Sequence, residues 1–120
     1  MNRKEFGRLG EDTAADYLVK EGYTIAARNY RCRLGELDIV AKKGCETVFV
    51  EVKTRSSLDF GMPSEAVGRD KRRHLRNTAA QYMVSHDGGG DCTFRIDIIE
   101  VLINGEGKFI RHIVNAVQES

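Results

Sequence analysis

The chain has 120 residues, 41% hydrophobic and 31% charged, with a single proline and a formal net charge of +1. This composition excludes a disordered or fibrous protein, and the length suits one folded domain, residues 1–120, with its own hydrophobic core. The apolar runs are far shorter than the roughly 20 residues of a membrane span, and the N-terminus lacks the apolar segment of a signal peptide. We therefore expect a cytoplasmic protein.

The first half of the chain predicts one helix followed by three strands. Apolar residues recur at helical spacing from about Lys4 to Glu21, with Asn2 as a candidate cap and Gly22 as a natural stop. YTIAARNYR (23–31), GELDIVA (35–41) and TVFVEVKTR (47–55) then have the composition and alternation of strands. A turn around Gly44 joins the last two strands into a hairpin.

The second half predicts a helix and two more strands. SSLDFGMP (56–63) is expected to be a loop, with Pro63 at the start of a helical region. The main helix should run from near Arg69 to Ser85, because an apolar stripe recurs along it: Leu75, Ala79, Tyr82 and Met83. TFRIDIIEVLI (93–103) and KFIRHIV (108–114) follow as strands paired across residues 104–107. This order of elements indicates an α/β fold.

The 35–41 and 47–55 hairpin carries charges within an otherwise apolar pattern. Because side chains alternate between the faces of a strand, one face should hold Leu37, Ile39 and Ala41 with Val48, Val50 and Val52. The opposite face should then hold Glu36, Asp38 and Val40 with Phe49, Glu51 and Lys53. Burial of the apolar residues therefore predicts that the charges gather on one side.

Asp38, Glu51 and Lys53 are expected to converge on one point of that face. Neighbours across a ladder lie about 5 Å apart, and like charges at this distance cost stability. A divalent cation would relieve the repulsion, and carboxylate oxygens suit Mg²⁺ or Mn²⁺. A solvated polar face on an antiparallel hairpin explains the hairpin alone equally well.

The acids also carry a family resemblance. Glu36-Leu37-Asp38 followed by Glu51-Val52-Lys53 resembles the D…ExK signature, PD-(D/E)xK, of restriction-endonuclease-like nucleases, although Leu37 stands where that signature has proline. With the flanking segments, the chain resembles the bacterial YraN family over nearly its whole length, a family of uncharacterised proteins regarded as nucleases. The first half is more distantly similar to archaeal Holliday-junction resolvases. The segments that carry the resemblance are GRLGEDTAADYLVKEGYTIAARNYR, GELDIVA, VFVEVKTR, FGMPSEAV, RIDIIEV and IRHIVNA.

The resemblance implies a restriction-endonuclease-like three-layer fold, with a central mixed sheet of about five strands flanked by helices. It implies Mg²⁺ or Mn²⁺ bound by Asp38, Glu51 and the Val52 carbonyl, with Lys53 orienting or activating water. Glu11, on the first helix, matches the position of an assisting glutamate in resolvases. Glu36 is open between a second metal ligand and a cap at the strand start.

Basic residues offer contacts to nucleic acid. Thr54 and Arg55 follow Lys53 at the strand end, where they are either phosphate contacts or ordinary strand-end residues. The basic run RDKRRHLR supplies further candidates for backbone contact, Lys71, Arg72 and Arg76, although basic helix faces are usually just solvated.

The remaining candidate ligands form no recognisable metal-binding pattern. Cys32, Cys45 and Cys92 contain no CxxC pair, so we favour structural thiols in a reducing compartment over a zinc site. Asp97 is expected to make a structural hydrogen bond. The histidines have no ligand spacing, and we treat them as surface or helix-end residues: His74, His86 and His112.

The leading hypothesis is a magnesium-dependent endonuclease that hydrolyses DNA, with branched or Holliday-junction DNA as a candidate substrate. A homodimer would suit a two-armed substrate. Two other hypotheses stay open: a non-catalytic nucleic-acid-binding module of the same fold, and a protein-interaction domain.

Overall fold

The computed structural model describes residues 1–57, 68–87 and 93–118. Its elements, in chain order, are α1 (Arg3–Lys20), β1 (Thr24–Cys32), β2 (Gly35–Lys43), β3 (Glu46–Arg55), α2 (Arg69–Asp87), β4 (Phe94–Asn104) and β5 (Gly107–Ile113). Each begins and ends within two residues of its predicted position. The predicted helical start at Pro63 lies outside the described residues.

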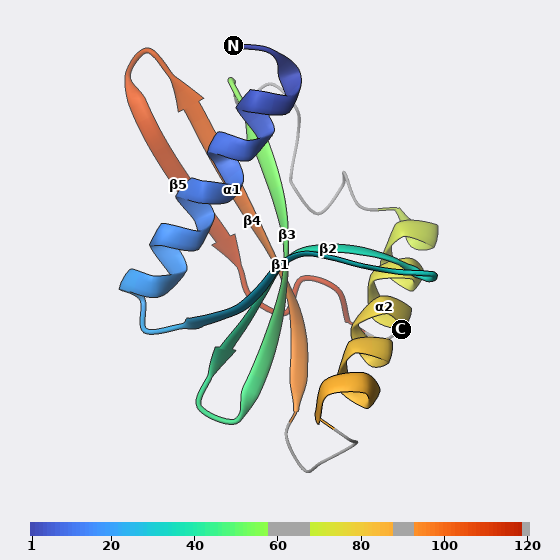
Figure 1. Ribbon diagram of the computed structural model, residues 1–120. Helices are drawn as coiled ribbons and strands as arrows, with labels where there is room; N and C mark the ends of the chain where they lie inside the picture. The colour runs from blue at the N-terminus through green and yellow to red at the C-terminus, as the bar shows by residue number, and fades with distance from the viewer. Residues whose placement is uncertain (58–67, 88–92, 119–120) are drawn as a thin grey trace.

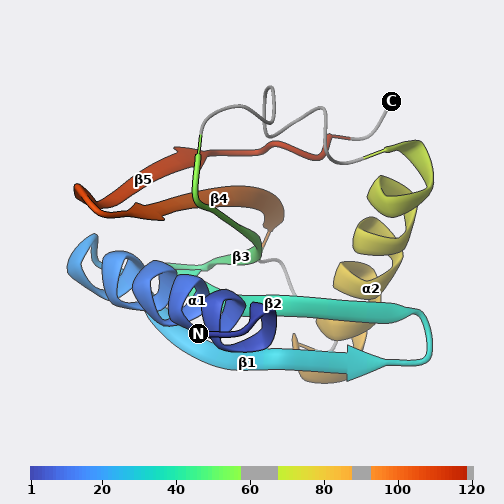
Figure 2. The ribbon, with the colours of Figure 1, turned by 90° about the horizontal axis from the view of Figure 1, so that it is seen from above.

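The five strands form one mixed sheet in the order β1-β2-β3-β4-β5, which Figure 2 shows from bottom to top. β3 and β4 are parallel, and the other neighbouring pairs are antiparallel. Helix α1 covers one face of the sheet and α2 covers the other (Figure 1). The predicted three-layer α/β fold with a mixed five-stranded sheet is therefore confirmed.

Each face of the sheet has its own hydrophobic cluster. On the α1 face, Leu18 packs in a cluster with Val48 and Val50 of β3. On the α2 face, the predicted helix stripe packs in a cluster with Phe49 of β3 and Ile98 of β4. Because the middle of β3, from Thr47 to Glu51, is buried, the charge of Glu51 stands in low-dielectric surroundings.

Helix α1 begins where the sequence predicted and lies very close to β3. The Asn2 side chain caps it by accepting a hydrogen bond from the Glu5 N–H at 2.8 Å. At Gly10, a Cβ atom would lie only 1.9 Å from the Thr54 hydroxyl oxygen. The absence of a side chain at Gly10 therefore allows α1 to approach the strand, and the next residue in the helix is Glu11.

The predicted hairpin register is confirmed in its apolar part, where Ile39 pairs with Val50 and Val40 with Phe49. The prediction is wrong for Leu37, which belongs to the α2-face cluster with Val40 and not to the cluster of Ile39. Between Leu37 and Ile39 the alternation of faces is interrupted at Asp38. On the neighbouring strand β1, Asn29 lies between the partners of Ile39 and Leu37, opposite Asp38, and its backbone is irregular, with a left-handed φ of 54°.

Two further expectations concern cysteines and membrane spans. Cys32 is a free thiol, as expected, whereas Cys45 is disulfide-bonded, so the expectation of free structural thiols is wrong for Cys45. Within the described part of the chain, neither helix has the length and apolar composition needed to cross a membrane.

Candidate active site

Asp38 and Glu51 meet where β2 and β3 begin to separate, one step beyond the pair formed by Ile39 and Val50. The Val52 N–H donates a hydrogen bond to Asp38 Oδ2 at 2.7 Å, which ties the carboxylate of one strand to the backbone of the next. Glu51 is only 7% exposed. Two carboxylates therefore lie together in partly desolvated surroundings.

Glu51 is held by two lysines from different elements. Lys53 Nζ lies 3.4 Å from Glu51 Oε1, and Lys71 Nζ lies 3.6 Å from the same oxygen. Lys53 comes from β3 and Lys71 from the first turn of α2. The structure thus brings Asp38, Glu51 and Lys53 together, and it adds Lys71, which was predicted only as a contact to nucleic acid.

The electrostatics of Asp38 reflect this crowding. Burial, followed by the negative charge of Glu51, raises the pKa of Asp38 from 3.8 to about 7. The hydrogen bond from Val52 opposes this shift, and so does the charge of Lys71. Two carboxylates that repel each other in this way form a site where a cation would be stabilised.

Glu11 reaches the same region from α1. Burial raises its pKa, Arg28 opposes the shift, and the charges of Glu36 and Glu51 add to it. Glu11 and Asp38 line one cavity of about 670 Å³ between α1 and the β1–β2 hairpin. Glu11 therefore belongs to the surroundings of the acidic pair, as the resemblance implied.

Basic residues that sequence reasoning missed rim this cavity. Arg28 of β1 lies 2.7 Å from Asp12 and 3.9 Å from Glu11. The cations lining the cavity are Arg3, Lys4, Arg8, Arg28 and Arg31. A signal was available in part, because residues 4, 8 and 11 share one helix face at i, i+4 and i+7.

Glu36 pairs with a basic residue of β1 and is largely exposed. Its side chain is 59% exposed and pairs with Arg31 at 3.1 Å. It lines the same cavity, and its charge contributes to raising the pKa of Glu11. The geometry favours a strand-start position over a ligand position for Glu36.

The candidates at the end of β3 have structural partners. Arg55 Nε donates to Glu100 at 2.7 Å, and this pair is largely buried. Thr54 contacts α1 at Gly10, on the face opposite Lys53. Neither side chain is presented as an exposed contact to phosphate.

The α2 candidates differ in their distance from the centre. Lys71 is at the site, and Arg72 is the next residue along the helix, half-buried. Arg76 donates to the Gln118 carbonyl at 3.2 Å and lines a different cavity. Of the three, Lys71 is the residue that the structure joins to the acidic pair.

The donor set at the acidic pair has few protein ligands for a divalent cation. Among residues 1–57, 68–87 and 93–118, no group of three or more His, Cys, Asp and Glu side chains is arranged to hold a metal. Mg²⁺, however, usually binds through one or two carboxylates and completes its shell with water and substrate phosphate. Within a strand, a residue's N–H and C=O face the same neighbour, so the Val52 carbonyl faces Asp38. Asp38, Glu51 and this carbonyl fit such a site.

A second polar cluster lies on the α1 face of the sheet. The fully buried Asp97 accepts hydrogen bonds from Arg95 and from the Asn115 N–H. His112 lies 2.7 Å from Asp97 and 2.8 Å from the Tyr17 hydroxyl. The structural role predicted for Asp97 agrees with these bonds, but the surface position predicted for His112 is wrong. The cluster ties α1, β4 and β5 together.

The fold and the paired acids at the centre of its sheet define a small α/β domain of the restriction-endonuclease-like arrangement. Residues 10–101 match the uncharacterised protein family UPF0102, to which the chain belongs. UPF0102 is the YraN family, so the resemblance seen in the sequence is confirmed.

Three relatives, each named as a UPF0102 protein, cover nearly the whole chain. The relative from Caldicellulosiruptor saccharolyticus is 51% identical over 110 residues, covering 92% of each chain. The relative from Caldicellulosiruptor bescii is 42% identical over 120 residues, covering 100% of this chain and 99% of the relative. The relative from Dictyoglomus thermophilum is 43% identical over 118 residues, covering 97% of this chain and 99% of the relative.

Proposed function

We propose that this protein is a metal-dependent endonuclease that hydrolyses phosphodiester bonds in DNA, with branched DNA as its preferred form. The observation that carries the proposal is the convergence of two repelling carboxylates, Asp38 of β2 and Glu51 of β3, with Lys53, which lies on the same strand as Glu51. Lys53 Nζ lies 3.4 Å from Glu51. A fold that needed only stability would gain by replacing the acids with apolar residues, because buried like charges are costly.

The chain's own residues have separate roles in this proposal. Asp38, Glu51 and the Val52 carbonyl would hold the cation, which when bound supplies charge neutralisation at the phosphate and a more acidic water. Lys53 donates hydrogen bonds to the attacking water or to the phosphate oxygens, where negative charge develops. Lys71 neutralises the acidic pair from the α2 side. Glu11 adds a further acceptor that orients water on the α1 side.

The basic rim supports nucleic acid as the substrate. Arg8 and Arg28 line the cavity that contains Asp38, and Lys71 stands on the other side of the acidic pair. Positive side chains around an acidic centre bind the phosphates on either side of the bond to be cut and leave the centre for the metal. A protein-interaction surface would not need the buried acids.

The test is a cleavage assay with the full chain and a panel of linear, flapped and four-way DNAs. We expect cleavage with Mg²⁺ or Mn²⁺, none with EDTA, and the fastest rate on a branched DNA. Asp38→Ala should lower the rate by about 100-fold or more, because it removes one of the two carboxylates that hold the metal. Asp16→Ala, a change at an exposed residue of α1, is the matched control and should leave the rate unchanged.

Cleavage that persists in EDTA or survives Asp38→Ala would contradict the proposed chemistry. Binding of DNA without any cleavage would instead indicate a nucleic-acid-binding module of the same fold. Thermal unfolding with Mn²⁺ gives an independent readout, since a ligand that binds only the folded state raises the midpoint by mass action.

A further inference from the structure

The sheet face that carries Glu51 and Lys53 continues beyond α2 onto β4 and β5. Helix α2 packs in a cluster with Ile96 and Ile98, at the earlier part of β4. Past this cluster, paired residues of β3, β4 and β5 form two rows that run across the strands on the same face. The first row is Lys53, Glu100 and Arg111, and the second is Arg55, Leu102 and Phe109.

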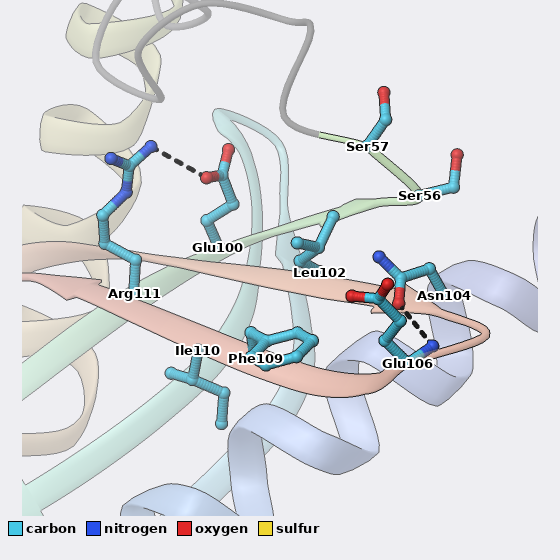
Figure 3. Close-up of a pocket in the computed structure, with 9 residues that line it drawn as sticks. All are labelled: Ser56, Ser57, Glu100, Leu102, Asn104, Glu106, Phe109, Ile110 and Arg111. Carbon is cyan, nitrogen blue, oxygen red and sulfur yellow. Dashed lines mark hydrogen bonds and ion pairs between the residues drawn. The ribbon is translucent and has the colours of Figure 1, made fainter.

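This part of the face is hollowed into a cavity of about 560 Å³ (Figure 3). Phe109 and Leu102 give it an apolar wall, and Phe109 is 50% exposed. Within the described ranges Phe109 stacks against no other ring. Ser56 and Asn104 line the cavity with polar side chains. The volume is in the range of sites that hold small organic groups.

The end of the cavity near the candidate active site carries an ion pair between Glu100 and the partly exposed Arg111. Glu100 is 4% exposed and is held by Arg55 at 2.7 Å and by Arg111 at 2.9 Å. Glu100 is therefore shared between two guanidinium groups, and Arg111 is the cation that lines the cavity itself. The Arg111 side chain is 44% exposed, so its charge faces the solvent. The opposite end of the cavity carries the acidic Glu106.

We propose that this cavity binds one unpaired nucleotide of the DNA substrate, with its base stacked on Phe109 and its phosphate near Arg111. The inference rests on the proposed nuclease function and specifies its substrate. An exposed aromatic ring beside a guanidinium is the usual platform for an unstacked base, and Asn104 with Ser56 offers hydrogen bonds to the base edge. A base paired within a duplex could not enter the cavity.

The position of the cavity agrees with a nucleotide close to the cut. Along the strands, Phe109 lies two rows from Glu51, which is about 13 Å for ideal strand geometry. Across the sheet it lies two strands away, which is about 10 Å. Arg111 lies one row nearer. A flap, bulge or junction arm whose strand runs from Lys53 across β4 would reach Phe109, which makes an unpaired segment beside the scissile phosphate the recognised feature.

The chain contains no tryptophan, so Phe109→Trp introduces a single fluorescent reporter at the cavity. The full-length variant is titrated in EDTA, to prevent cleavage, with a duplex carrying a single-stranded flap and with the same duplex fully paired. Stacking should quench the tryptophan on the flapped DNA and leave it nearly unchanged on the paired DNA. Val19→Trp, at an exposed position near the end of α1, is the control and should not be quenched.

The affinity for a labelled flapped duplex, measured by fluorescence anisotropy, gives a second readout. Phe109→Ala should weaken it about tenfold, which is about 1.4 kcal/mol, because the base loses the ring on which it stacks, and Phe109→Tyr should largely restore it. Affinity for the paired duplex should stay unchanged. Phe109 is half exposed, so these variants should fold.

Equal quenching of Phe109→Trp by both DNAs, no quenching at saturation, or equal loss of affinity for both DNAs would overturn the subsite. Binding and quenching without cleavage in Mg²⁺ would leave the subsite standing and contradict only the proposed reaction. Failure of every DNA to bind would overturn both.

Discussion

The position and the pKa of Asp38 both depend on the neighbouring strands. Its position was predictable, because the apolar residues of the hairpin determine the register. Its side chain stands at the point where the alternation of β2 is interrupted, next to the irregular β1 backbone at Asn29. The sequence pattern carries no signal of that interruption, since Leu37, Ile39 and Ala41 follow a regular two-residue period.

The raised pKa of Asp38 predicts a pH-dependent penalty on folding without metal. Folding raises this pKa from 3.8 to about 7, so the folded state binds the proton more tightly than the unfolded state. Well below pH 4 the carboxyl of Asp38 is protonated in both states and does not lower the free energy of unfolding. As the pH rises toward 7, ionisation of Asp38 lowers the free energy of unfolding progressively. Asp38→Asn keeps a hydrogen-bond acceptor for the Val52 N–H and removes the charge.

In EDTA, Asp38→Asn should therefore be more stable than the wild type at pH 8, by a few kcal/mol as an order of magnitude. Urea unfolding between pH 4 and pH 8 measures this, and the difference should close toward pH 4. Asp16→Asn provides the comparison at an exposed position. A gain that stays constant across the pH range would contradict the assigned cause.

At the scale of elements, the site depends on how closely α1 approaches β3. Helical periodicity predicted the helix, and the run of apolar residues predicted the strand. The sequence could not predict that Gly10 faces Thr54 or that Arg28 pairs with Glu11, because both contacts join separate elements. Arg55 shows the same limit, since its partner Glu100 comes from a distant strand.

Gly10→Ala should destabilise the protein by about 1–3 kcal/mol, because the new methyl group would overlap the Thr54 side chain. Gly7→Ala is the matched control on the same helix. A Cβ at Gly7 meets nothing within 4 Å, so this change should stabilise the protein by about 0.5–1 kcal/mol through helix propensity. Chemical unfolding measures the change in the free energy of unfolding for each variant. If both changes had the same sign, the explanation by close approach of α1 to Thr54 would be refuted.

At the scale of the whole molecule, the fold places the acids on the middle strand β3 and its neighbour β2, with a helix on each face of the sheet. The family and the three-layer architecture could be predicted from sequence. The total charge of +1 gave no sign of the basic rim, which gathers from α1 and β1 only in three dimensions, or of Lys71 of α2 on the other side of the acidic pair. The homodimer stays a prediction.

The basic rim and Lys71 predict a salt-dependent affinity for DNA. Arg8→Gln or Lys71→Gln should each lower the slope of log affinity against log salt by about one, if each side chain contacts one phosphate. Lys20→Gln, at the far end of α1, should leave the slope unchanged. Anisotropy titrations over a range of salt concentrations in EDTA measure the slopes, and identical slopes for all three variants would exclude the rim from the interface.

The most direct test of a catalytic centre on the β2–β3 hairpin is the rate of Mg²⁺-dependent cleavage of a branched DNA under single-turnover conditions, compared between the wild type and Lys53→Met. Lys53 belongs to the centre without being a proposed metal ligand, so its removal should leave metal binding in place and lower the rate by about 100-fold or more. Lys20→Met is the control for the loss of a lysine and should cleave like the wild type. A Lys53→Met rate equal to that of the wild type would contradict the account.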